Sequence, residues 1–204
     1  TKSGPPVTKP NWRLLLDKKS TLKFTNFYET KNGMVEPTCE QFHKWNLNGK
    51  QVTHVRMDGA GENKKLQARS DSSDWKLNIK FEITAHNTPQ QNHLVELGFA
   101  TLANRGRAMM NQANLPLSVR YKVFKEAFTT ATHLDGLMPV EIQGKIATRY
   151  VHFFGENPRF ANHLGTWGEA GTVKTKTKAT PRIADRGTQC MFGGYAIDHT
   201  GDTY

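Results

Sequence analysis

Long apolar runs are absent from this sequence of 204 residues. No stretch approaches the roughly 20 consecutive apolar residues that a membrane-spanning helix requires. The longest runs, such as the one from Trp12 to Leu16, have the length of a strand. The first ten residues contain Lys2 and Lys9 but no apolar core, so they do not have the pattern of a secretory signal. We therefore expect a soluble, intracellular protein that does not enter a membrane.

Cysteine is scarce, and this scarcity limits the chemistry that the chain can support. The two cysteines, Cys39 and Cys190, are far apart and cannot form a disulfide framework. Neither has a Cys or His partner at the spacing of a zinc site. The histidines around position 90, His86 and His93, also have no ligand at zinc spacing. We expect reduced thiols and no zinc site in this segment.

Acidic residues are outnumbered: Lys and Arg total 28, Asp and Glu total 18, and the net charge is +10. The sequence pI is about 9.7, and the basic excess is spread over both halves of the chain. A domain with a pI above about 9 is a candidate for binding nucleic acid, because Lys and Arg displace counterions from phosphates. Many basic proteins bind no polyanion, so charge alone leaves both interpretations open.

Alternating and helical hydrophobic patterns predict an α/β domain with a mixed sheet. Val95, Phe99, Leu102 and Met109 mark the predicted buried stripe of the longest helix. After about residue 149 the chain becomes rich in Gly, Thr and Lys, and its short strands indicate a small β-barrel. The predicted order is strands at 12–17 and 22–28, a helix at 34–47, a strand at 52–57, a helix at 62–68, a strand at 80–84, and helices at 91–112 and 116–136.

Two acidic residues occupy positions that suit a metal-dependent enzyme. Asp58 directly follows the predicted strand 52–57, and open α/β sheets bind their ligands at the carboxyl ends of strands. Glu96 lies about one turn inside the predicted helix 91–112. Taken alone, Asp58 before Gly59 is also typical of a turn, and Glu96 is also typical of an exposed helix surface.

Two motifs carry a resemblance to a known family. Segment 55–63, VRMDGAGEN, resembles the signature of copia-type retrotransposon integrases around their second catalytic aspartate. Segment 88–96, TPQQNHLVE, resembles the signature around their catalytic glutamate. Further segments at 104–110, 138–141 and 192–195 match the family's later landmarks in order, so the resemblance covers nearly the whole chain. The chain departs from the pattern at Gly59-Ala60, His93 and Leu97, positions that affect the fine geometry of the site.

The resemblance implies a ribonuclease H-like core at 1–148, with a mixed sheet and flanking helices, and a small β-barrel at 149–204. It also implies DNA integration, a metal-dependent polynucleotidyl transfer that joins retroelement DNA 3′ ends to target DNA. Asp58 and Glu96 would hold Mg²⁺ or Mn²⁺ as catalytic ligands, since these hard cations prefer carboxylate oxygens. Integrases act as homo-oligomers on DNA, in the nucleus after a stage in a cytoplasmic virus-like particle.

The family's first catalytic aspartate has no counterpart in the opening residues. The resemblance places it on a central strand upstream of the hairpin at 12–28, and residues 1–11 contain no acid. Asp17 is either that metal ligand or a turn residue. We expect that the sequence begins after the first strand and that this chain alone is catalytically inactive. The sheet should then either have a gap beside the Asp58 strand or close up with non-native pairing.

Four further residues are candidate nucleic-acid contacts: Asn92, Lys64, Lys65 and Arg107. Asn92 precedes Glu96 by four residues and therefore shares its helix face, although it could equally satisfy backbone donors at the helix start. The three basic residues could contact phosphates or form a solvated surface. The alternative to an integrase is a non-catalytic nucleic-acid-binding relic of a retrotransposon polyprotein. A ribonuclease H-like nuclease with the same metal chemistry is a third possibility.

Overall fold

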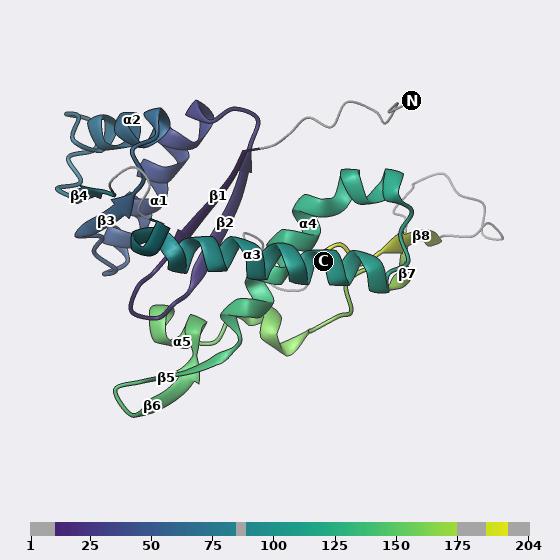
Figure 1. Ribbon diagram of the computed structural model, residues 1–204. Coiled ribbons are helices and arrows are strands. Elements are labelled where there is room, and N and C mark those ends of the chain that lie inside the picture. The colour runs from purple at the N-terminus through teal and green to yellow at the C-terminus, as the bar shows by residue number, and fades with distance from the viewer. Residues whose placement is uncertain (1–10, 85–88, 175–186, 196–204) are drawn as a thin grey trace. The chain divides into compact units, whose positions relative to one another are not determined.

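The computed structural model describes residues 11–84, 89–174 and 187–195, and the side chains of 89–91 are not described (Figure 1). The chain divides into two compact units. We call them the N-terminal unit, with the described residues up to Leu15 and Asn26–Gly98, and the C-terminal unit, with Leu16–Thr25 and the described residues from Phe99 on. Within the described part of the chain, no helix is both long and apolar enough to cross a lipid bilayer.

The first two strands, β1 (Asn11–Leu16) and β2 (Lys23–Tyr28), pair with each other. The Asp17 carboxylate closes the turn between them by accepting hydrogen bonds from the Ser20 backbone N–H at 2.7 Å and from its hydroxyl at 2.6 Å. Thr21 completes the turn with a φ of 57°, in the left-handed region. These strands confirm the two predicted at 12–17 and 22–28.

The N-terminal unit contains two helices and a parallel pair of strands. A short 3₁₀ turn, η1 (Asn32–Met34), leads into α1 (Val35–Leu47), which buries Cys39, Phe42 and Trp45 at helical spacing. The strands β3 (His54–Met57) and β4 (Lys80–Ile83) run parallel, with Met57 paired to Ile83. Between them lies α2 (Gly61–Ser70), three residues longer than the helix predicted at 62–68. The predicted helix and strands of this segment are therefore confirmed.

Among residues 11–84, 89–174 and 187–195, one edge of β3 has no partner strand. In the described residues β3 pairs only with β4, and β1 pairs only with β2. A strand edge without a partner leaves backbone N–H and C=O groups without ladder hydrogen bonds. Residues 1–10 lie outside the described part of the chain, so the gap expected beside the Asp58 strand stays a prediction.

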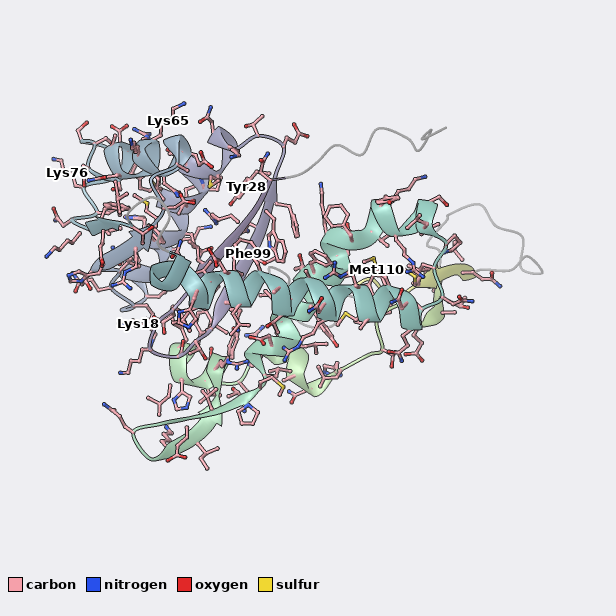
Figure 2. All side chains as sticks on the ribbon, viewed as in Figure 1. Lys18, Tyr28, Lys65, Lys76, Phe99 and Met110 are labelled. Atoms are coloured by element: carbon pink, nitrogen blue, oxygen red, sulfur yellow. The ribbon has the colours of Figure 1, made fainter. Side chains whose placement is uncertain are left out.

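The C-terminal unit is built on the long helix α3 (Pro89–Gln112), from Phe99 onward, and on α4 (Leu117–Gly136). Leu102, Gly106 and Met110 are buried at intervals of four residues, so they form one stripe of α3. Of the predicted stripe, Leu102 is fully buried, and Val95, Phe99 and Met109 are partly buried. Met109 packs against the cluster that contains Met110, which is 5% exposed and was not part of the predicted stripe. Figure 2 labels Phe99 and Met110 on this helix.

A buried cluster holds α3, α4 and the later chain together. Met110, Ala127 and Trp167 form its centre, and the Trp167 indole N–H donates to the Gly193 carbonyl at 3.0 Å. Gly106 lets the two helices approach closely, since a Cβ at this position would lie 2.2 Å from the Phe128 ring.

A hairpin that the sequence did not predict follows α4. It comprises β5 (Pro139–Ile142) and β6 (Lys145–Thr148), joined by Gln143 and Gly144 at φ 52° and 77°. Two central residues with positive φ are typical of a type I′ turn, which fits the twist of an antiparallel pair. The helix α5 (Arg149–Phe154) begins directly after it, capped by the Thr148 hydroxyl, and ends at Gly155 in the left-handed conformation.

The last described elements are the 3₁₀ helix η2 (Arg159–Asn162) and the antiparallel strands β7 (Ala170–Lys174) and β8 (Gly187–Met191). Within 149–174 and 187–195 these strands form a two-stranded sheet and no closed barrel. Residues 175–186 and 196–204, on which the barrel prediction also depends, lie outside the described residues. The predicted boundary between 148 and 149 stays a prediction.

Candidate active site

Asp58 lies at the carboxyl end of the parallel β3–β4 pair. Met57, the last residue of β3, is buried and fixes the strand in the unit, whereas Asp58 is exposed. Because the two strands run parallel, their carboxyl ends share one edge of the sheet, where α/β folds bind ligands. The structure thus places Asp58 at the end of a strand, as the sequence predicted.

A short hydrogen-bond network orients the Asp58 carboxylate. Its Oδ1 atom accepts from the Asn63 side-chain amide at 2.6 Å and from the Ala60 backbone N–H at 3.2 Å. The same Asn63 amide donates to the Asp58 backbone carbonyl at 3.3 Å. The Oδ2 atom has no hydrogen bond to a described residue, so it remains available to a cation.

Asn63 is a site residue that the sequence analysis did not single out. It lies in the first turn of α2, five positions after Asp58, where its side chain reaches back over the turn. The signal was present in the sequence, because an Asn at this point of a helix start often hydrogen-bonds to the preceding turn. Asn63 also helps to fix the start of α2, whose N-cap residue Ala60 makes no side-chain capping bond.

An ion-pair network anchors α2 at its other end. The Arg69 guanidinium contacts Glu36 of α1 at 2.7 Å and Asp74 at 2.6 Å. The hydrogen bond from Arg69 holds the pKa of the Glu36 carboxyl below its usual value. Trp75 donates to the same carboxylate at 3.1 Å. This network fixes α2 to α1, and α2 carries the residue that orients Asp58.

Glu96 is exposed on α3, and Asn92, one turn earlier, is half-buried. Asp58 and Glu96 both belong to the N-terminal unit. Thr88, the first residue of the TPQQN motif, lies outside the described residues, and so do the side chains of the next three. The convergence of the Asp58 and Glu96 carboxylates on one metal site stays a prediction.

Asp17 is a turn residue in the structure. Both of its hydrogen bonds from Ser20 end on one oxygen, Oδ2, and close the β1–β2 turn. Asp17 also belongs to the C-terminal unit, whereas Asp58 and Glu96 belong to the other. Among the described residues, no three His, Cys, Asp or Glu side chains gather in a group that could hold a metal ion.

The three basic candidates for phosphate contacts are all exposed. Lys65 extends from α2 (Figure 2), and its ammonium donates to the Asn32 side chain at 3.0 Å. Lys64 precedes it on the same helix, and both belong to the N-terminal unit. Arg107 belongs to the C-terminal unit and donates to Asn104 one turn earlier on α3. Their exposure suits phosphate contacts and a solvated surface equally.

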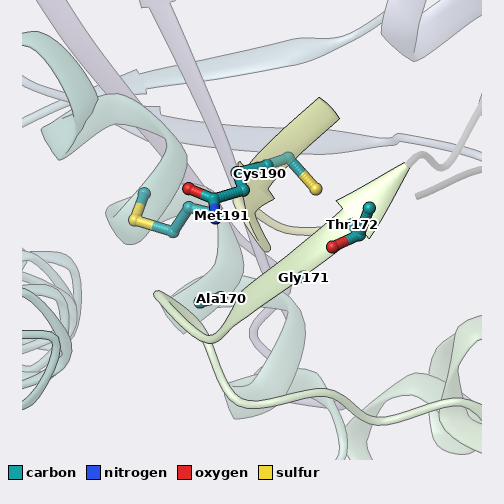
Figure 3. Close-up of a pocket in the computed structure, with 6 residues that line it drawn as sticks. Ala170, Gly171, Thr172, Cys190 and Met191 are labelled. Atoms are coloured by element: carbon teal, nitrogen blue, oxygen red, sulfur yellow. The ribbon is translucent and has the colours of Figure 1, made fainter. Parts of the chain in front are cut away.

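Two grooves are lined by residues of the C-terminal unit. One is lined by facing residues of β7 and β8, among them Thr172 and Cys190 (Figure 3). The other extends from this hairpin to α4 and includes Glu126 and Tyr195. Neither is lined by Asp58 or Glu96.

Comparison with known proteins identifies the fold. No protein-family model matches the chain, and no curated protein matches it. Among solved structures, the catalytic core domain of BIV integrase matches with a TM-score of 0.50 and 16% identity, over 72% of this chain and 87% of that one.

Two further solved structures match with TM-scores below 0.5. The HTLV-2 integrase catalytic core domain in complex with magnesium matches with a TM-score of 0.45 and 17% identity, over 71% of this chain and 93% of that one. A simian T-cell lymphotropic virus intasome in complex with the PP2A regulatory subunit B56 gamma matches with a TM-score of 0.49 and 15% identity, over 89% of this chain and 66% of that one. From the BIV match, we conclude that the chain has the mixed α/β fold of a retroviral integrase catalytic core.

Proposed function

We propose that the chain is the catalytic core of a copia-type integrase, which joins retroelement DNA 3′ ends to target DNA. The observation that carries the proposal is the position of Asp58. It ends a parallel strand in an integrase-core fold, and its carboxylate is oriented by Asn63 with one oxygen available. The TPQQNHLVE segment supplies the second acid, Glu96, at the start of α3.

The donor set fits a hard divalent cation. Asp58 and Glu96 are both exposed carboxylates, and Mg²⁺ or Mn²⁺ binds through carboxylate and water oxygens. When bound, the metal would stabilise the charge on the attacking and leaving oxygens of an in-line displacement. Asn63 would keep the Asp58 carboxylate in one orientation. Asn92, Lys64, Lys65 and Arg107 would contact DNA phosphates.

A metal-binding titration tests the proposed ligands directly. Mn²⁺ binding is measured on the chain by electron paramagnetic resonance for the wild type, Asp58→Asn, Glu96→Gln and a control, Glu126→Gln, on an exposed residue of α4. Each ligand variant should weaken Mn²⁺ binding by about tenfold or more, the effect of losing a charged ligand. The control should bind as the wild type does. Equal Mn²⁺ affinity in Glu96→Gln and in the control would show that Glu96 is not a metal ligand.

One observation favours the alternative, a nucleic-acid-binding relic without catalysis. The described residues contain no group of three metal-ligating acids, whereas the net charge of +10 still suits DNA. A strand-transfer assay with labelled viral-end and target duplexes separates the possibilities when it is run on this chain and on a version extended upstream through the expected first aspartate. Joined products that Asp58→Asn abolishes support the integrase, and nicked products without joining support a nuclease. Duplex binding without either product supports the relic.

Assembly and location belong to the same proposal. An integrase joins DNA ends as a multimer, so we propose a homo-oligomer that acts on chromosomal DNA in the nucleus. Sedimentation of the chain with and without a viral-end duplex measures the first part. A chain that stays monomeric at all concentrations, with and without DNA, would contradict it.

A further inference from the structure

The C-terminal unit contains a charged cluster that the proposed active site does not use. Asp135, near the end of α4, contacts Lys23 of β2 at 2.7 Å, Arg105 of α3 at 2.5 Å and Arg149 of α5 at 3.0 Å. The Asp135 side chain is 2% exposed and the Lys23 side chain is 9% exposed. Four elements of the unit thus bring their charges to one point, which we call the Asp135 cluster.

The charges of the Asp135 cluster do not balance. One carboxylate meets three cations, and the ion pairs that the described residues form with these cations all end on Asp135. The cluster therefore carries an excess of two positive charges beside a buried carboxylate. Like charges this close repel one another, more strongly where burial lowers the effective dielectric constant. An added anion would relieve this repulsion.

The arginines offer donors to such an anion. Arg149 is held in place by its bonds from Nε to the Thr21 hydroxyl and from Nη1 to the Asp135 backbone carbonyl, both at 2.9 Å. Arg105 uses Nη1 for Asp135, and its side chain is 39% exposed. Within the described part of the chain, Nε and Nη2 of Arg105 donate no hydrogen bond, and neither does Nη2 of Arg149. Guanidinium forks match the oxygens of a phosphate group in a bidentate manner.

The position of Arg105 separates this cluster from the proposed active site. Arg105 follows Glu96 by nine residues on α3, which places the two on opposite faces of the helix. Arg107, in contrast, follows Glu96 by three turns and shares its face. An anion at the Asp135 cluster would therefore not be the substrate phosphate at the metal ligands.

We propose that the Asp135 cluster is a phosphate-binding site, formed by Arg105 and Arg149, with Lys23 paired to Asp135. Asp135 holds the three cations in position and cancels one charge, and the phosphate cancels much of the remainder. A backbone phosphate of a nucleic acid and a free phosphate ion have the same recognition chemistry. The site does not depend on the proposed integrase activity, because it contains neither Asp58 nor Glu96.

Calorimetric titration with inorganic phosphate tests the site, in a buffer with a metal chelator and with ionic strength held constant by chloride. The wild type should bind saturably, and Arg105→Gln should weaken binding by about tenfold or more. Arg159→Gln removes the same charge from an exposed arginine of the same unit and should bind as the wild type does. Absence of saturable binding by the wild type, or an equal loss in Arg159→Gln, would overturn the proposal.

Two further variants control for folding and for the active site. Arg105→Lys keeps the charge without the fork and should lie between the wild type and Arg105→Gln. Asp58→Asn should bind phosphate as the wild type does, so that a failed integrase proposal leaves this result intact. If Arg105→Gln loses its helical circular dichroism signal, the phosphate affinity of Arg105→Lys tests the site instead. Wild-type phosphate affinity in Arg105→Lys would contradict a bidentate site.

A short DNA duplex identifies the source of the phosphate. If the site contacts the nucleic-acid backbone, Arg105→Gln should weaken duplex binding more than Arg159→Gln does, and inorganic phosphate should compete with the duplex. If the site takes free phosphate, the two variants should bind the duplex equally, while only Arg105→Gln loses phosphate binding. Either result supports the phosphate site and assigns its occupant.

Discussion

At the scale of single residues, the C-terminal unit contains a buried carboxylate, Asp135, that forms ion pairs with three cations. Asp135 is almost completely buried and depends on Lys23, Arg105 and Arg149 for compensation. Removal of one partner from a buried ion pair is strongly destabilising, because the other charge stays buried without a partner. The negative charge of Asp135 therefore stabilises the fold of the C-terminal unit, because without it the three cations would repel one another.

The first prediction follows from this dependence. Asp135→Asn keeps the size of the side chain but leaves three cations together without an anion. The free energy of unfolding should fall by about 3–5 kcal/mol, as measured by urea denaturation. Glu156→Gln, on an exposed residue of the same unit, is the control and should change it by less than about 1 kcal/mol. An equally small change in Asp135→Asn would contradict a stabilising role for the buried carboxylate.

His133 makes the second prediction, which concerns pH. Burial lowers the pKa of this histidine from 6.5 to about 4, and its ring lies among Phe160 and Tyr195. The unfolded chain takes up a proton as the pH falls below 6.5, whereas the folded chain stays neutral until about pH 4. Because the unfolded state binds more protons over this interval, stability is complete above 6.5 and falls as the pH decreases.

The expected loss at His133 is about 1.4 kcal/mol per pH unit within the interval, or about 3 kcal/mol in total. It is measured as the free energy of unfolding of the wild type and of His133→Phe, near neutral pH and near pH 5. The variant should lose less stability than the wild type on acidification. A parallel loss in both proteins would show that His133 does not titrate differently on unfolding.

At the scale of elements, Gly106 makes the third prediction. Alanine favours a helix over glycine by about 1 kcal/mol, but a Cβ at 106 would lie 2.2 Å from the Phe128 ring. Overpacking of this kind costs about 1–3 kcal/mol, so Gly106→Ala should lower the melting temperature. Gly61→Ala in the first turn of α2 has open space around its Cβ and should leave the melting temperature equal or higher. A higher melting temperature in Gly106→Ala than in the wild type would show that α3 and α4 can move apart at little cost.

Local patterns explain which elements the sequence could predict. Apolar residues at the spacing of a strand or a helix mark the β1–β2 pair and the helices α1, α3 and α4. The β5–β6 hairpin has no such signal, because its turn residues are Gln143 and Gly144 and not an Asn-Gly or Asp-Gly pair. The burial of Met110, which the predicted stripe did not include, depends on the Ala127 and Trp167 side chains of the same cluster. That contact is tertiary and is not encoded in local spacing.

The candidate site divides in the same way. Asp58 could be placed at a strand end because Val55 and Met57 alternate with polar residues before a glycine break. The role of Asn63 depends on a side chain that reaches back across a turn, which spacing suggests but does not fix. The Asp135 cluster joins residues that are far apart in the sequence, such as Lys23 and Asp135, which are 112 positions apart. A single sequence contains no pattern that reveals such a convergence.

At the scale of the whole molecule, the excess of positive charge makes the last prediction. The net charge of the chain is +10. Basic residues occur in both units, among them Lys64 and Lys65 in the N-terminal unit and Arg105 and Arg107 in the C-terminal unit. Contacts to phosphates release counterions, so log K for duplex binding should fall linearly with log salt, with a slope of about −0.9 per phosphate contact. Replacement of one contacting residue by Gln should make the slope less steep by about 1. Fluorescence anisotropy across a salt series measures the slope, with Arg159→Gln as the charge-matched control. An affinity that stays constant between about 50 and 200 mM salt would exclude an electrostatic footprint and, with it, a DNA-binding role for this charge.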